Sequence, residues 1–169
     1  DIGLQSGGWT IEWQGKAGAI TPGTTILEGI RAAVSPETQV TYNAAGSFEG
    51  MAEVGIAVLS EPPYAEWFGD SATLALPADQ LAMVEQMRTH SKTLIVILLS
   101  GRPLVITDQL LAADVFIAAW LPGTEGDGVT DALFGNAPFT GKLPFTWLRN
   151  IDQIPFDFSA LTTEGCNTP

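Results

Sequence analysis

The sequence is poor in cysteine, in histidine and in long apolar runs. Its single cysteine, Cys166, cannot form an internal disulfide, and one thiol does not build a cysteine-based zinc site. No stretch approaches the roughly 20 apolar residues of a membrane-spanning helix. The sole histidine, His90, leaves no serine–histidine pair or metal site that can be assembled around it. We therefore expect neither a metal nor a cofactor.

Positive charge is also scarce. The chain has 7 Lys and Arg against 19 Asp and Glu, which gives a net charge of −12. Such a surface repels phosphate backbones and anionic lipid headgroups, so we expect no nucleic-acid partner and no membrane partner. The 169 residues suit one domain, and the 46% hydrophobic content disfavours global disorder.

Apolar runs alternate with helix signals along the chain. The run TLIVILLS (93–100) is the clearest buried strand. Thr25 and Glu28 have the spacing of a capping box, which predicts a helix over 26–34. The other predicted strands are 39–44, 52–60, 115–121 and the strand-like 141–147, and the other predicted helices are 78–90, 107–113 and 129–135. This alternation predicts an α/β protein with a parallel sheet covered on both faces.

Three loops follow the predicted strands and should meet at one rim. They are EPPYAEWFGD (61–70), SGRP (100–103) and PGTEGDG (122–128). Ligands of open parallel sheets bind outside the carboxyl ends of the strands. The third loop lacks the Lys-Ser/Thr of a P-loop and contains two acids, which disfavours phosphate binding. The candidate site is therefore the acidic rim formed by the first loop.

The first loop combines acids with rings. Glu61, Glu66 and Asp70 stand close to Tyr64 and Trp67. Hydrolysis of a glycosidic bond needs a proton donor and a second carboxylate, and a carboxyl beside rings loses hydration as a general acid requires. The alternative is a solvated acidic loop whose rings cap the core. From the residues alone, any of the three acids could be the proton donor.

A second aromatic segment, GGWTIEWQG (7–15), lies near the start of the chain. Trp9 and Trp13 stand four apart between glycines. They can form an exposed stacking platform for sugar rings or, alternatively, helix-spaced core aromatics. The flanking glycines weaken a helix, so exposure and burial remain equally open.

Four segments together resemble the second domain of glycoside hydrolase family 3, above all the β-glucan exohydrolases of plants and marine bacteria. They are GGWTIEWQG, EPPYAEWFGD, LLSGRPLVI and AAWLPGTEGDGVTDALFGNAPFTGKLPFTW. The resemblance runs from Asp1 to about Pro155. It implies a three-layer (α/β)6 sandwich with a mostly parallel six-stranded sheet, here lacking its first strand. It also implies a preceding (β/α)8 barrel, with the active site between the two domains.

The resemblance assigns roles by position. The barrel of that family supplies an aspartate nucleophile, and the sandwich supplies the acid/base glutamate in a Glu-His-Pro-Tyr-x-Glu-x-x-Gly-Asp segment. Glu66 takes the acid/base position here. Trp13 takes the position of one wall of an aromatic slot for the leaving glucose, and Trp9 supports it. The substrate so implied is a β-glucan or β-gluco-oligosaccharide.

This chain departs from the family pattern at several positions. Pro62 replaces the usual histidine, and Ser6 stands where plant relatives have a cysteine. Trp67 and Phe68 replace smaller or polar residues, which can dry the acid/base or reshape the rim. Substrate preference is therefore left open by the resemblance.

The expected organisation is an acid/base-bearing sandwich over 1–155 and an irregular extension over 156–169. No segment resembles the nucleophile motif, so we expect a fragment of a longer enzyme that is inactive alone. The resemblance also implies a secreted or periplasmic location. Two other interpretations remain, namely a non-catalytic glucan-binding or structural module and an unrelated flavodoxin-like ligand binder.

Overall fold

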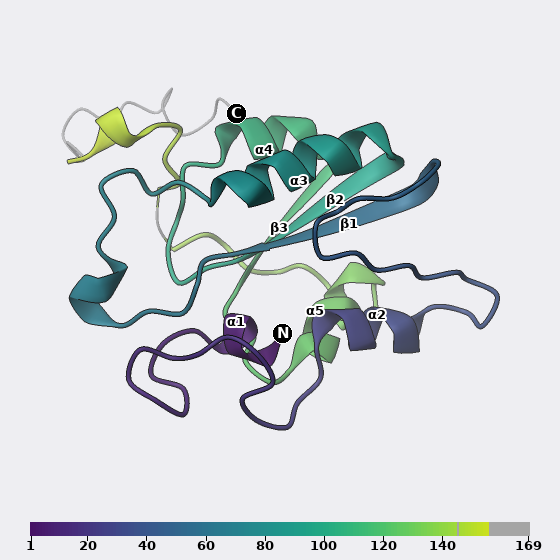
Figure 1. Ribbon diagram of the computed structural model, residues 1–169, viewed down its shortest axis with the longest axis horizontal. Coiled ribbons are helices and arrows are strands. Elements are labelled where there is room, and N and C mark those ends of the chain that lie inside the picture. Colours follow the sequence, from purple (N-terminus) through teal and green to yellow (C-terminus); the bar gives the residue numbers. More distant parts are fainter. Residues whose placement is uncertain (145, 156–169) are drawn as a thin grey trace.

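The computed structural model describes residues 1–144 and 146–155, where three parallel strands form one sheet with helices on both faces (Figure 1). The strands are β1 (Ala52–Ser60), β2 (Ser91–Leu99) and β3 (Val115–Trp120), in the spatial order β1-β2-β3. Helices α3 (Ala78–Thr89) and α4 (Thr107–Ala112) cover one face. Helices α1 (Ile2–Ser6), α2 (Ile26–Ala33) and α5 (Gly126–Leu133) cover the other. The predicted α/β class and the covered parallel sheet are confirmed.

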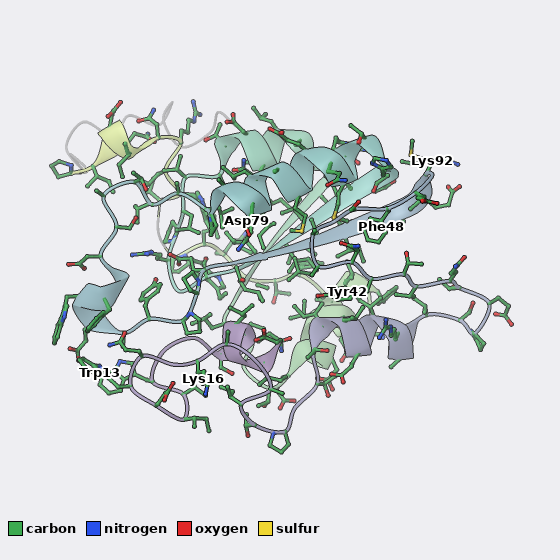
Figure 2. The ribbon with its side chains drawn as sticks, in the orientation of Figure 1. Trp13, Lys16, Tyr42, Phe48, Asp79 and Lys92 are labelled. Carbon is green, nitrogen blue, oxygen red and sulfur yellow. The ribbon has the colours of Figure 1, made fainter. Side chains whose placement is uncertain are left out.

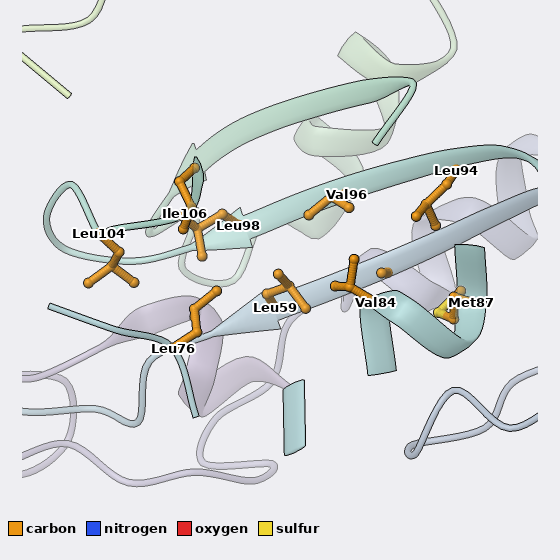
Figure 3. Close-up of a cluster of buried hydrophobic side chains, with 10 residues drawn as sticks. Leu59, Leu76, Val84, Met87, Leu94, Val96, Leu98, Leu104 and Ile106 are labelled. Atoms are coloured by element: carbon orange, nitrogen blue, oxygen red, sulfur yellow. The ribbon is translucent and has the colours of Figure 1, made fainter. Parts of the chain in front are cut away.

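The central strand β2 builds both halves of the core, because successive side chains of a strand point to opposite faces. Leu94, Val96 and Leu98 join the cluster beneath α3 and α4 (Figure 3). Ile97 and Leu99 join the second cluster, which α2 fills from the other face. This two-sided burial explains why the apolar run of β2 is continuous.

Helices α2, α3 and α4 begin where the sequence predicts, whereas α5 begins at Gly126, ahead of the predicted start at residue 129, and α1 was not predicted. Thr25 Oγ1 accepts a hydrogen bond from the Glu28 backbone N–H at 3.2 Å, and Glu28 Oε2 accepts one from the Thr25 N–H at 2.8 Å. This capping box starts α2, whose apolar face buries Ile26 and Ile30. Pro77 precedes the first turn of α3, and His90 ends that helix.

Two predicted strands are wrong in the part of the chain that the structure describes. Residues 39–44 form no strand, and Tyr42 is 65% exposed. The side chain of Asn43 accepts hydrogen bonds from the backbone N–H groups of Ala45 and Ser47, so the segment closes into a turn instead of pairing with a strand. The described residues of 141–147 also form no strand.

The edge strands are less buried than their apolar sequences indicate. In β1 the first three residues are exposed, and Val58 is 38% exposed. This exposure follows from the place of β1 and β3 at the edges of the sheet, because among the described residues only β2 has a strand on each side. The structure contains three strands in these residues and leaves the expected six-stranded sheet and its first strand untested.

The expected irregular extension over 156–169 lies outside the described residues, as does residue 145. A 3-10 helix, η2 (Ile151–Gln153), is the last described element. None of the helices in residues 1–144 and 146–155 is long and apolar enough to cross a membrane.

Candidate active site at the carboxyl end of the sheet

Segments 7–15, 61–70 and 100–102 meet beyond the carboxyl ends of β1 and β2. Trp13 and Lys92 lie at opposite ends of the molecule in Figure 2, and Lys92 is next to the start of β2. The first two segments touch through their backbones, because a Cβ on Gly8 would collide with the carbonyl of Tyr64. A Cβ on Gly15 would meet Pro63 Cβ at 2.8 Å. Glycine is needed at both positions for this close approach.

Glu61 is held by an ion pair. Its Oε1 accepts hydrogen bonds from Arg102 Nη2 at 2.6 Å and from Arg102 Nε at 3.0 Å, and its side chain is 10% exposed. The Arg102 Nη1 group donates to the backbone carbonyl of Gly69, which lies at the far end of the same loop. A guanidinium used in this forked way fixes both ends of the loop that follows β1.

Tyr64 completes this polar cluster. Its hydroxyl donates to Glu61 Oε2 at 3.2 Å, and Arg102 Cζ lies 4.6 Å from the centre of its ring. Burial, followed by the negative charge of Glu61, raises the pKa of Tyr64 to about 12, although the Arg102 charge acts in the opposite direction. With this pKa, Tyr64 is protonated at physiological pH and can donate its hydrogen bond to Glu61.

Glu66 differs from Glu61 in its exposure and in its contacts. It begins the 3-10 helix η1 (Glu66–Gly69), and its side chain is exposed. Among residues 1–144 and 146–155 its carboxylate has no hydrogen-bond or ion-pair partner. Its backbone φ is 54°, a left-handed conformation that is uncommon for residues other than glycine. The structure therefore leaves this carboxylate open to a ligand and does not enclose it between Trp67 and Tyr64.

Four exposed rings, two of which follow Glu66 directly in the chain, contact one another, and we call them the ring cluster. Trp13 is at its centre, with its ring centre 6.3 Å from Trp9, 5.5 Å from Trp67 and 5.8 Å from Phe68. Trp67 and Phe68 are stacked at 5.9 Å. Trp13 is 41% exposed and the other three rings are more exposed, so Trp9 and Trp13 are not core aromatics. A surface of this kind can dock the apolar face of a sugar ring.

The third loop after the sheet is tied to a different part of the molecule. The Gly123 N–H donates to the carbonyl of Gln5, and the Gly126 N–H donates to the carbonyl of Thr24. Its two acids, Glu125 and Asp127, join neither the Glu61–Arg102 pair nor the ring cluster. Asp70 is exposed and closes η1 through its backbone N–H.

Sequence reasoning misses two residues that organise the site, Arg102 and Gln14. The sequence places Arg102 only in a turn, although a rare cation beside an acidic rim is a usable signal for an ion pair. The side-chain oxygen of Gln14 accepts a hydrogen bond from the Ala65 backbone N–H at 2.9 Å. No pattern in the sequence indicates that bond.

In residues 1–144 and 146–155, no group of three or more His, Cys, Asp or Glu side chains is arranged to hold a metal ion. What the arrangement offers is an open carboxylate, an exposed aromatic surface next to it, and a braced loop that carries both. These features suit acid/base chemistry on a ligand with flat apolar faces.

Comparison with known families gives one match that covers nearly the whole chain. The model of the glycosyl hydrolase family 3 C-terminal domain matches residues 1–166. The chain is 33% identical to a periplasmic β-glucosidase of Salmonella typhimurium over 66% of its own length. It is 27% identical to a lysosomal β-glucosidase of Dictyostelium discoideum over 97% of its length. The chain spans 15% and 23% of those two relatives.

A solved structure agrees with these relatives. The exo-1,3/1,4-β-glucanase ExoP of a Pseudoalteromonas species superposes with a TM-score of 0.71 at 37% identity. The match covers 78% of this chain and 17% of that protein.

Proposed function

The chain belongs to glycosyl hydrolase family 3, as its C-terminal domain, and from this membership we propose that it supplies the general acid/base of an exo-acting, retaining β-glucosidase or β-glucan exohydrolase. The acid/base is Glu66. The nucleophile is an aspartate on a companion (β/α)8 barrel of the same enzyme. The substrate is a terminal β-D-glucosyl residue of a glucan or gluco-oligosaccharide.

One observation carries the choice of Glu66, namely the contrast between the two glutamates of the loop. Glu61 is bound by Arg102 and Tyr64, so its carboxylate is committed to holding the loop. Glu66 is exposed and lies next to the ring cluster. A general acid must reach the substrate oxygen directly or through one water, and the carboxylate of Glu66, which is free of such contacts among the described residues, favours it over Glu61 for that role.

The proposed reaction follows the retaining scheme. The barrel aspartate attacks the anomeric carbon while Glu66 donates its proton to the departing oxygen, so the glycosidic bond breaks and a glycosyl-enzyme forms. Glu66 then takes a proton from a water molecule, which attacks the anomeric carbon and releases the aspartate. Retaining geometry requires the two carboxyl groups about 5–5.5 Å apart. That distance must be met across the junction of the two domains.

Trp13 and Trp9 hold the sugar on the leaving-group side. Trp13 forms one wall of a slot for the leaving glucose, and Trp9 supports it at 6.3 Å. Trp67 and Phe68 extend the same surface, which favours a substrate longer than a single sugar with a small aglycone.

The proposed organisation is a sandwich domain over 1–155, which carries Glu66, and an extension over 156–169. We also propose that the enzyme is secreted or periplasmic. The periplasmic and lysosomal locations in the names of two relatives support a compartment outside the cytosol.

Azide rescue in the complete enzyme tests the assignment. A Glu66→Ala variant should lose activity on oligosaccharides, and azide should restore turnover of 2,4-dinitrophenyl β-glucoside with β-glucosyl azide as the product. Azide is an anion, so it attacks the glycosyl-enzyme in place of water without needing a general base, and this aglycone leaves without a proton. Glu61→Ala serves as the control and should give no azide product. Rescue of Glu61→Ala in place of Glu66→Ala would overturn the assignment.

A second candidate function is a non-catalytic glucan-binding module, which the exposed ring cluster favours. The isolated chain then binds laminari-oligosaccharides tightly by itself. Tryptophan fluorescence titration distinguishes the two, because a half-site that needs a companion barrel should bind them only weakly.

A further inference from the structure

We propose that Gln14 is a positioning residue, which sets the direction of the Glu66 carboxylate relative to the ring of Trp13. The inference rests on the function proposed above. It adds a residue that touches neither the substrate nor the reacting atoms.

The contact that carries it is a hydrogen bond between two loops. Gln14 Oε1 accepts from the Ala65 backbone N–H at 2.9 Å, 51 residues further along the chain. Ala65 is 3% exposed and extended, with φ −134° and ψ 144°. The chain then turns sharply at Glu66, where φ is 54°. The bond therefore fixes the peptide group from which this unusual turn departs.

The orientation of the Gln14 amide is determined by its partner. Because the Ala65 N–H is a donor, the oxygen of Gln14 must face it, which leaves Nε2 on the other side. Nε2 is buried and has no hydrogen-bond partner among the described residues. A buried donor without a partner is costly, and methionine would fill similar space without that cost. Packing alone thus does not explain a glutamine at this position, whereas its acceptor oxygen does.

The neighbours of Gln14 make the bond relevant to the site. Trp13 precedes it at the centre of the ring cluster, and Gly15 follows it against Pro63. Gln14 thus lies between the proposed sugar-binding ring and the proposed proton donor. The hydrogen bond from Ala65 to Gln14 joins the segment that carries Trp13 to the segment that carries Glu66. A shift of one segment against the other would change the direction of the Glu66 carboxylate relative to the Trp13 ring.

Leaving-group dependence in the complete enzyme tests the inference. A misdirected general acid slows the hydrolysis of substrates whose departing oxygen must be protonated. It has little effect on 2,4-dinitrophenyl β-glucoside, whose leaving group departs without a proton. Misplacement by about 1 Å can cost about 100-fold. For Gln14→Met we expect the ratio of kcat/KM on laminaribiose to kcat/KM on the activated glucoside to fall by about 10- to 100-fold.

Gln80 provides a matched control. Its side chain also bridges to a backbone, since its Oε1 accepts from the Ser60 N–H and its Nε2 donates to the Ser60 carbonyl, both at 2.8 Å. Gln80→Met should lower the thermal stability and leave the ratio unchanged. Gln14→Glu retains an acceptor oxygen for Ala65, so at its own pH optimum it should recover the ratio to within about threefold of the parent.

Three results would overturn the inference. The first is that Gln14→Met slows both substrates equally. The second is that Gln80→Met changes the kcat/KM ratio as much as Gln14→Met does. The third is that Gln14→Glu folds but does not recover the ratio. Glu66→Ala is measured in parallel to separate the two proposals. If it shows no leaving-group dependence, the proposed function is wrong as well. If it does and Gln14→Met does not, only the role of Gln14 is wrong.

Discussion

Arg102 Nη2 lies 2.6 Å from Glu61 Oε1, and this ion pair joins the loop after β2 to the loop after β1. Because Arg102 also donates to the carbonyl of Gly69, one side chain holds the start and the end of the segment that carries Glu66. The exposed carboxylate therefore stands on a braced loop and not on a loose one.

Removing Arg102 should destabilise the fold. Arg102→Met leaves the Glu61 carboxylate without its cation at a site that is only 10% exposed, which should lower the free energy of unfolding by about 2–3 kcal/mol. Chemical denaturation followed by circular dichroism measures the change. The double variant Glu61→Gln, Arg102→Met should lose less than the sum of the single variants, since it leaves no unpaired charge. Additive losses would show that the pair is not coupled.

Tyr64 should ionise only at high pH. The Tyr42→Phe variant leaves Tyr64 as the sole phenol, and its absorbance near 295 nm should show little ionisation at about pH 11, because its pKa is about 12. The folded state holds this proton more tightly than the unfolded chain, whose tyrosine pKa is about 10. The stabilisation is therefore present below about pH 10 and is lost as the pH rises toward 12. Half-ionisation near pH 10 in a folded protein would contradict this.

Asp114 should make the stability of the fold depend on pH in the acidic range. Its Oδ2 accepts from the Leu94 N–H at 2.7 Å and from Arg88 Nη1 at 2.6 Å, and these contacts, the backbone bond first, lower its pKa below the ordinary value of 3.8. Its contribution is therefore present above that value and is lost as the pH falls through the lowered pKa. Asp114→Asn should reduce stability at neutral pH, and the difference from the parent should shrink in acid. A difference that is constant with pH would contradict this.

Trp13 should contribute more to oligosaccharide affinity than Trp9. In the complete enzyme, Trp13→Ala should raise the KM for laminari-oligosaccharides about tenfold, equivalent to about 1.4 kcal/mol. Trp9→Ala should have a smaller effect, because its ring is 68% exposed and contacts only one member of the ring cluster. Steady-state kinetics on a series of chain lengths measures both. Equal effects, or a larger effect of Trp9→Ala, would argue against the slot proposed here.

Local signals in the sequence predicted the main elements of the fold. The apolar run of β2 and the Thr25–Glu28 capping box each specify their own structure through neighbours in the chain. Residues 39–44 resemble a strand by composition, but a strand also needs a partner to pair with, which composition does not supply. The match of the family model to residues 1–166 confirmed the family resemblance. The resemblance could be recognised from the sequence because several separate segments occur in the order typical of the family.

The contacts that organise the candidate site could not be predicted in the same way. Arg102 meets Glu61 across 41 residues, and Gln14 meets Ala65 across 51, so neither pairing has a local pattern. Position in the family motif named Glu66 and Trp13, but it gave no reason why Glu61 should be excluded. The proposal excludes Glu61 because of its ion pair with Arg102, a contact that forms only when the loops are folded against each other.

The left-handed backbone of Glu66 has a consequence for protein engineering. A glutamate with φ 54° carries a conformational cost of about 1–2 kcal/mol, which asparagine in the same place largely avoids. A laboratory selection for heat resistance alone should therefore favour asparagine at position 66 and discard the proton donor proposed there. Thermostable libraries of this enzyme would need an activity screen at every round, because a replacement that stabilises the fold at this position would also remove the proposed proton donor.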